Sequence, residues 1–83
     1  MTIIEGTIEK IETEQNHGKE KKVITLQMGR HNKAFVEFQG KMMDWLESYS
    51  EGDRVSMRIR YNGKISSLGR KYNNIIAKSI KTV

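Results

Sequence analysis

Residues 54–61 alternate between two kinds of side chain, and this alternation constrains the fold of the chain more than any other feature. Arginine or serine occupies the even positions, and an apolar residue or tyrosine occupies the odd positions. Successive side chains of a β-strand point to opposite faces. One face of such a strand carries Arg54, Ser56, Arg58 and Arg60, and the other carries Val55, Met57, Ile59 and Tyr61. The apolar face predicts burial in a core, whereas the row of cations predicts contact with either water or a polyanion.

Four further segments are predicted to be strands: residues 3 to about 14, 22–28, 33–39 and 71 to about 81. The first segment changes phase, because its apolar positions are even up to Ile8 but odd at Ile11, and this change predicts a bulge or bend. Gly6 in the same strand predicts the close approach of another backbone. The predicted inner face of the last strand comprises Ile75, Ala77 and Ile80.

Residues 41–50 show a different period, with large apolar or aromatic side chains at positions i, i+3, i+4 and i+7. This spacing predicts a helix of about three turns whose stripe faces the core. The stripe comprises Met42, Trp45, Leu46 and Tyr49. Turns are predicted at residues 15–19, 29–32, 52–53 and 62–63, the last because Asn-Gly is a strong hairpin-turn dipeptide. Gly69 predicts a second break, and residues 64–70 are expected to form an exposed basic loop.

The order of these elements predicts an all-β fold. Five strands with one short helix between the third and fourth strands are typical of a Greek-key barrel of the OB type, with all strands antiparallel. A closed barrel also removes exposed strand edges, which matters in a chain that has no proline to protect them. A five-stranded sheet capped by a helix is the structural alternative. The length of 83 residues fits a single OB-fold domain spanning residues 1–83.

Composition limits where the protein acts. No run of about 18 apolar residues is present, so no transmembrane helix is expected. Residues 1–6 lack the basic region followed by an apolar stretch that marks a signal peptide, and we expect a cytoplasmic location. The chain has no cysteine, which excludes disulfides and thiolate metal sites.

Catalytic chemistry has little support in the sequence. His17 and His31 both lie in predicted turns, and no cysteine completes a metal site with them. Glu9, Glu12 and Glu14 show no pattern of catalytic partners, and no glycine-rich phosphate loop is present. We therefore expect a protein that is not an enzyme and that uses no cofactor or metal.

Charge is segregated along the chain, whose net charge is +5. Residues 54–83 carry eight Lys or Arg and no Asp or Glu, and residues 16–33 are also basic. Residues 34–53 carry five Asp or Glu against one lysine, and residues 1–15 are acidic as well. Such segregation is typical of an anion-binding face. It also fits a homo-oligomer in which acidic and basic patches of neighbouring copies meet.

Two stretches resemble bacterial single-stranded-DNA-binding OB domains. The first is Gly69-Arg70-Lys71-Tyr72 followed by residues 73–80, which is similar to the final hairpin of those domains. The second is residues 35–38, then the helix, then Glu51-Gly52-Asp53-Arg54-Val55, which is similar to a strand and a glycine turn that opens the next strand. The resemblance covers nearly the whole chain. It is closest to short bacterial OB-domain proteins related to single-stranded-DNA-binding protein, with primosomal replication protein B a more distant relative.

This resemblance implies an OB fold and binding of single-stranded DNA, but the chain departs from the family in two ways. Family members usually end in a disordered tail with an acidic tip that recruits other proteins. This chain has a short basic segment at residues 80–83, so recruitment through such a tail is not implied. Family members also place several aromatic residues on the binding face, whereas this chain has six aromatic residues in all.

Two aromatic residues are candidates for stacking on bases. Phe35 lies on the polar side of its predicted strand, between Lys33 and Glu37. It is a stacking platform, an oligomer contact or a residue packed under a loop. Tyr72 follows Arg70 and Lys71, and it either contacts a base or caps the end of the barrel. Tyr61 is in phase with Ile59 and is expected at the edge of the core, and Phe38, Trp45 and Tyr49 are expected within it.

The sequence therefore predicts a module that binds single-stranded nucleic acid, DNA more than RNA, largely without sequence preference. Single-strand binding combines a basic groove with aromatic platforms. The predicted binding residues are Lys33, Phe35, Arg54, Arg58, Arg60, Lys64, Arg70, Lys71 and Tyr72. Lys19, Lys21 and Lys22 either extend this path or form a solvated turn. Because one small domain offers a short groove, we expect a homodimer or tetramer. The alternative is a protein-interaction or oligomer-assembly module that does not bind nucleic acid.

Overall fold

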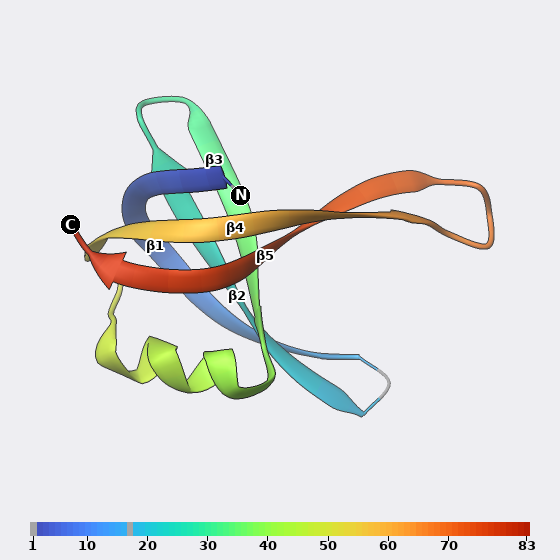
Figure 1. Cartoon of the computed structure of the whole chain (residues 1–83), viewed down its shortest axis with the longest axis horizontal. Helices are drawn as coiled ribbons and strands as arrows, with labels where there is room; N and C mark the ends of the chain where they lie inside the picture. The colour runs from blue at the N-terminus through green and yellow to red at the C-terminus, as the bar shows by residue number, and fades with distance from the viewer. Residues whose placement is uncertain (1, 17) are drawn as a thin grey trace.

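Five strands close into a barrel in the order β1-β2-β3-β5-β4, as the computed structural model of the chain shows (Figure 1). The structure describes residues 2–16 and 18–83, with only the backbone at residue 16. Its elements are β1 (Thr2–Asn16), β2 (Lys19–Met28), β3 (Asn32–Gln39), the 3-10 helix η1 (Gly40–Ser48), β4 (Arg54–Ile65) and β5 (Lys71–Thr82). The predicted OB-type barrel, with one short helix between its third and fourth strands, is confirmed.

One pair of neighbouring strands is parallel. β3 and β5 pair in parallel through Val36 with Ile75 and Glu37 with Ile76, whereas all other neighbouring strands are antiparallel. The expectation of an all-antiparallel barrel is therefore wrong. The reason is geometric, because strand directions cannot alternate all the way around a closed ring of five strands.

β1 joins the two halves of the barrel by pairing with two strands. Residues 2–7 pair with β4, and residues 7–16 pair with β2. The register shifts between Ile8 and Lys10, which confirms the predicted bulge. A Cβ atom on Gly6 would lie 2.4 Å from the carbonyl oxygen of Gln27, so the predicted close approach at Gly6 is confirmed.

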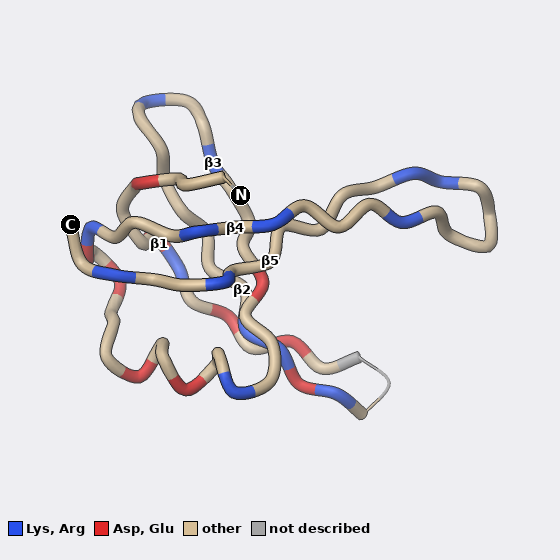
Figure 2. Tube along the Cα trace, in the orientation of Figure 1, with Lys and Arg blue, Asp and Glu red and all other residues tan. Residues whose placement is uncertain are grey.

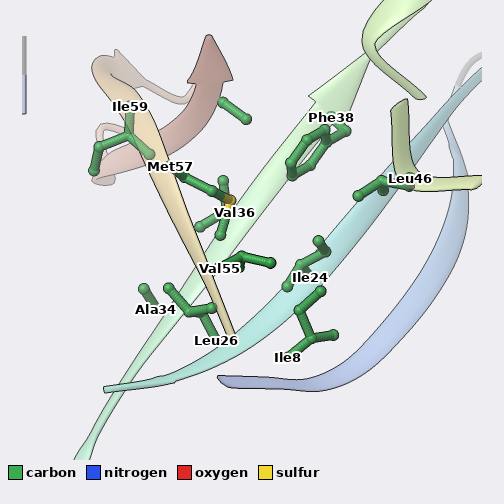
Figure 3. Close-up of a cluster of buried hydrophobic side chains, with 11 residues drawn as sticks. Ile8, Ile24, Leu26, Ala34, Val36, Phe38, Leu46, Val55, Met57 and Ile59 are labelled. Atoms are coloured by element: carbon green, nitrogen blue, oxygen red, sulfur yellow. The ribbon is translucent and has the colours of Figure 1, made fainter. Parts of the chain in front are cut away.

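The core fills the barrel from the inner faces of the strands and from one side of η1 (Figure 3). Its buried residues are Ile8, Ile24, Leu26, Ala34, Val36, Phe38, Leu46, Val55, Met57, Ile59 and Ala77. Ile75 and Ile80 are partly buried against this core, so the predicted inner face of β5 is confirmed. Lys78 stands outside the β4–β5 ladder, because Arg58 pairs with Ser79 and Ile59 pairs with Ala77. This bulge explains why the inner positions of β5 change from odd to even.

The helix winds more tightly than the sequence predicts. η1 is a 3-10 helix, in which residues three apart align because each turn contains about three residues. Leu46 is buried, and Met42, Met43 and Tyr49 pack partly buried against the core, with the Tyr49 Oη donating to the carbonyl oxygen of Ile80 at 3.4 Å. Trp45 is 42% exposed, so its predicted place in the core is wrong.

β4 and β5 continue beyond the barrel as a two-stranded arm (Figure 1). The last pair between β1 and β4 is Thr2 with Ile59, whereas the β4–β5 ladder continues to Ile65 with Lys71. We call residues 62–74 the arm, because they pair only with each other or form its turn. Tyr61 lies at its base on the inner face, as predicted, but is 56% exposed. The expectation that Tyr61 belongs to the core edge is wrong, because β1 no longer flanks β4 at this position.

The turn of the arm lies further along the chain than predicted. Asn62 and Gly63 do not form a turn, because they pair with Asn74 and Asn73 within the ladder. The chain reverses instead at residues 66–70, where the Ser66 amide donates to the carbonyl oxygen of Arg70 at 2.8 Å. Gly69 supplies the positive φ of 82° within this turn. The predicted basic loop at residues 64–70 is thus shortened, with residues 64–65 belonging to β4.

Candidate nucleic-acid interface

The outer face of β4 carries a row of cations. Arg54, Arg58 and Arg60 are exposed, and the apolar residues that alternate with them are buried, so the predicted separation of the two faces is confirmed. Ser56 lies in the same row but is buried between its cross-strand partners, Glu5 of β1 and Lys81 of β5. The small serine side chain leaves the arginines as the groups that reach solvent from this face.

The arm extends this row and adds an aromatic residue. Lys64 of β4 pairs with Tyr72 of β5, and directly opposed residues of a ladder share one face. Both residues are in phase with Arg60, and both are exposed. Tyr72 lies beyond the barrel, so the alternative that it caps the barrel end is excluded. We call Arg54, Arg58, Arg60, Lys64, Tyr72 and Lys81 the basic face.

The register adds Lys81 to the predicted site and separates Lys71 from it. Lys81 is the cross-strand partner of Ser56 and is exposed on the same face as the arginines. Lys71 pairs with Ile65 and therefore lies on the opposite face of the arm, and Arg70 lies in its turn. The phase change between Ala77 and Ile80 was the signal in the sequence that could have placed Lys81 outward.

The cations of β4 and β5 have no acidic neighbours on their own strands. Figure 2 shows Lys and Arg, and no Asp or Glu, along both strands and around the tip of the arm. The ion pairs among the described residues all lie in β1–β3: Lys10–Glu12, Lys21–Glu14, Lys21–Glu37 and Lys33–Glu9. Within the described part of the chain, no carboxylate forms an ion pair with the basic face, and Glu5 of β1, opposite Ser56, is the acidic residue that borders it.

Phe35 is exposed on the outer face of β3. It is 60% exposed and pairs with Thr25, which in turn pairs with Lys10 of β1. This exposure excludes packing under a loop and leaves base stacking or an oligomer contact. The neighbouring Lys33 donates from Nζ to Oε1 of Glu9 at 2.8 Å. Its charge is therefore already partnered, unlike the charges of the basic face.

β5 separates Phe35 from the β4 cations of the basic face by the width of one strand. Across the outer surface, Glu37 of β3 pairs with Ile76 of β5, which pairs with Arg60 of β4. Phe35 lies two residues before Glu37 on the same side of β3. The structure thus brings most of the predicted binding residues onto two adjacent outer surfaces, with Lys71 on the far face of the arm.

The arm also contains a hollow beside Tyr72. This hollow measures about 400 Å³ and is lined by Gly63, Lys64, Ile65, Lys71, Tyr72 and Asn73. Gly63 has no side chain, which leaves space beside the side chain of its cross-strand partner, Asn73. Four of these residues, Gly63, Ile65, Lys71 and Asn73, lie on the face of the arm opposite Tyr72, so the hollow belongs mainly to that far face.

A metal site and a membrane-spanning helix are two further possibilities for residues 2–16 and 18–83. Within these residues, no group of three or more His, Cys, Asp or Glu could hold a metal ion. No helix in the described part of the chain is long and apolar enough to cross a membrane. His17, expected in the first turn, lies outside the described residues.

No protein-family model matches this chain, and no curated protein matches it in sequence. The geometry of the basic face, together with the exposed Phe35 beside it, is therefore the basis for assigning a function.

Proposed function

We propose that the basic face binds single-stranded nucleic acid, DNA more than RNA, with little sequence preference. The observation that carries this proposal is the row of Arg54, Arg58, Arg60 and Lys64 on one face, with Tyr72 directly opposite Lys64. Alternate residues of a strand are about 7 Å apart, so Arg58 and Arg60 lie about one such step apart, whereas Ser56 and Asn62 separate Arg54 and Lys64 from them by two steps. No described carboxylate pairs with them, so their charges are free to contact phosphates.

The chemistry of these side chains explains why the binding would be insensitive to sequence. Guanidinium groups form paired hydrogen bonds to phosphate oxygens and also stack on planar groups. Each base that stacks on an aromatic side chain contributes about 1–3 kcal/mol, and every base has a face that can stack. Tyr72 and Phe35 supply two such platforms. The proposal assigns binding to this face, without a catalytic step or a cofactor.

The length of the site favours more than one copy of the chain. The longest dimension of the molecule is 39 Å, and this includes the arm. OB folds occupy about 4–16 nucleotides each, so neighbouring copies would extend the path of a longer strand. The proposal includes a homodimer or tetramer and a cytoplasmic location. The resemblance of the sequence to bacterial single-stranded-DNA-binding OB domains supports it.

Fluorescence anisotropy with labelled oligonucleotides about 20–30 nucleotides long tests the proposal. Single-stranded DNA, single-stranded RNA and duplex DNA are titrated at several salt concentrations. For single strands, each phosphate that the protein neutralises adds roughly −0.7 to the slope of log affinity against log salt concentration. If the four cations of β4 each contact a phosphate, the expected slope is about −3. Absence of binding at low salt would refute the proposal.

A pair of charge-matched variants locates the site. Arg58→Glu with Arg60→Glu reverses two exposed side chains in the middle of the basic face, and we expect it to abolish binding. Arg30→Glu with Lys41→Glu makes the same change in net charge at exposed positions outside the basic face and should bind nearly as wild type. Equal losses in both variants would show that only the overall charge matters and that the basic face is not the site.

A further inference from the structure

The arm carries exposed apolar side chains that the basic face does not use. Leu68 in the turn is 84% exposed, and Ile65 is 71% exposed. Ile65 is out of phase with Lys64, so it lies on the face of the arm opposite Tyr72. The surrounding charges are all positive, because residues 62–74 contain Lys64, Arg70 and Lys71 and no acid. The far face and tip of the arm therefore present two large exposed apolar side chains, Ile65 and Leu68, beside the cations Arg70 and Lys71.

A second surface has the opposite character. A hollow of about 350 Å³ lies between η1 and β5, lined by Trp45, Ser48, Tyr49, Ser79 and Ile80. Trp45 is 42% exposed there. Asp44, Glu47 and Glu51 are exposed on η1 and just after it, and none of them belongs to an ion pair among the described residues. The η1 side of this surface is therefore acidic around its aromatic residues, whereas Lys78 and Lys81 flank its β5 side.

We propose that the arm of one copy docks on the η1 hollow of a second copy. Leu68 and Ile65 would pack against Trp45, while Arg70 and Lys71 pair with Asp44 and Glu47. The complementarity of charge selects a second copy as the partner. Residues 62–74 have three cations and no acid, whereas residues 40–53 have four acids and one lysine. Two arms facing each other would instead place like charges together.

One copy cannot make this contact with itself. The arm points away from η1 and projects beyond the barrel (Figure 1). A contact between two different surfaces closes a pair when it is reciprocal and propagates along a chain when it is not. The contact uses the tip and far face of the arm, whereas Lys64 and Tyr72 of the basic face lie on its other face, so this inference does not depend on nucleic-acid binding.

Sedimentation velocity of the full chain, without nucleic acid, tests the contact. We expect concentration-dependent association at low salt that weakens as salt increases, since the rim pairs are solvent-exposed. The arm variant is Ile65→Asp with Leu68→Asp, and the helix variant is Asp44→Lys with Glu47→Lys. All four positions are exposed, so circular dichroism should match that of the wild type. Each variant alone should sediment as a monomer.

Mixing the two variants distinguishes this contact from other modes of association. The arm variant keeps an intact η1 hollow, and the helix variant keeps an intact arm, so an equimolar mixture should form a one-to-one complex. Arm-to-arm packing would be broken by the arm variant only, and the mixture would not restore it. Three results would each overturn the proposal. The first is a mixture that does not restore association, the second is a wild-type protein that stays monomeric at all concentrations, and the third is association that is unchanged in both variants.

Arg58→Glu with Arg60→Glu serves as the control for the contact. It should associate as the wild type does while failing to bind single-stranded DNA. The arm and helix variants should keep the binding of a short oligonucleotide by one copy to within about threefold, because most of the basic face is intact in both. Failure of one proposal therefore leaves the other measurable.

Discussion

Lys21 of β2 and Glu37 of β3 form an ion pair with 2.6 Å between Nζ and Oε1. The Glu37 side chain is only 8% exposed although it lies on the outer face of the barrel, and the Lys21 side chain is 28% exposed. Lys33 and Glu9 form a pair of similar length, 2.8 Å, but both side chains are about half exposed. The two pairs thus share their geometry and differ in burial.

This difference predicts unequal effects of removing the lysine. Lys21→Met should destabilise the protein by about 1–3 kcal/mol, because it leaves a buried carboxylate without its donor. Lys33→Met should cost less than about 1 kcal/mol, because water replaces an exposed partner. Urea unfolding monitored by circular dichroism measures both. Similar losses for the two variants would contradict the role of burial, and Lys21→Met with Glu37→Gln should recover part of the loss.

Gly6 is predicted to tolerate no side chain. Its Cβ would lie 2.4 Å from a backbone oxygen of β2, which cannot move without disturbing the β1–β2 ladder. Gly6→Ala should therefore destabilise the barrel by about 1–3 kcal/mol or more. Gly63→Ala is the control, because its Cβ would lie 3.2 Å from the flexible side chain of Asn73. That variant should stay within about 1 kcal/mol of the wild type in thermal unfolding. The reverse order of the two losses would contradict the close approach at Gly6.

The barrel could be predicted from the sequence because its inner faces follow local alternation. Val55, Met57 and Ile59 are buried as their spacing indicates, and even the bulges were visible as phase changes. The winding of η1 was not visible, since α-helices and 3-10 helices both bring residues i and i+3 close. The Asn62-Gly63 signal failed because both residues are paired within the ladder, and the turn formed at residues 66–70.

The candidate site could be predicted only in part, because its neighbours depend on register. The alternation placed Arg58 and Arg60 together, but no local pattern indicates that Lys64 lies opposite Tyr72. The ion pair between Lys33 and Glu9 joins residues 24 positions apart across a bulge. A cation that looked free in the sequence is therefore partnered in the fold, and the assignment of Lys33 to the site stays a prediction.

Phe35 is predicted to contribute to nucleic-acid binding through its aromatic ring. Phe35→Ala should weaken the binding of single-stranded DNA by about 5- to 150-fold, which corresponds to the loss of one stacked base. Phe35→Tyr should retain affinity, whereas Phe35→Leu should lose most of it despite its apolar side chain. Because Phe35 is 60% exposed, unfolding midpoints should change little. Unchanged affinity in Phe35→Ala would confine the bound strand to the basic face of β4 and β5.

The arm is predicted to open without unfolding the barrel. Residues 62–65 of β4 pair only with β5, whereas residues 55–59 pair with both β1 and β5. A lone two-stranded hairpin is at best marginally stable in water, so the arm lacks the support that the barrel strands have. Its hydrogen-bonded amides should therefore exchange at least about tenfold faster than those of residues 55–59 in amide hydrogen exchange followed by NMR. Equal protection would mean that the arm unfolds together with the barrel. The same measurement on the helix variant, with single-stranded DNA added, tests where the nucleic acid binds. Because that variant lacks a competent η1 surface, its arm cannot be protected by self-association. Slower exchange in its arm alone would therefore place the nucleic acid on the arm.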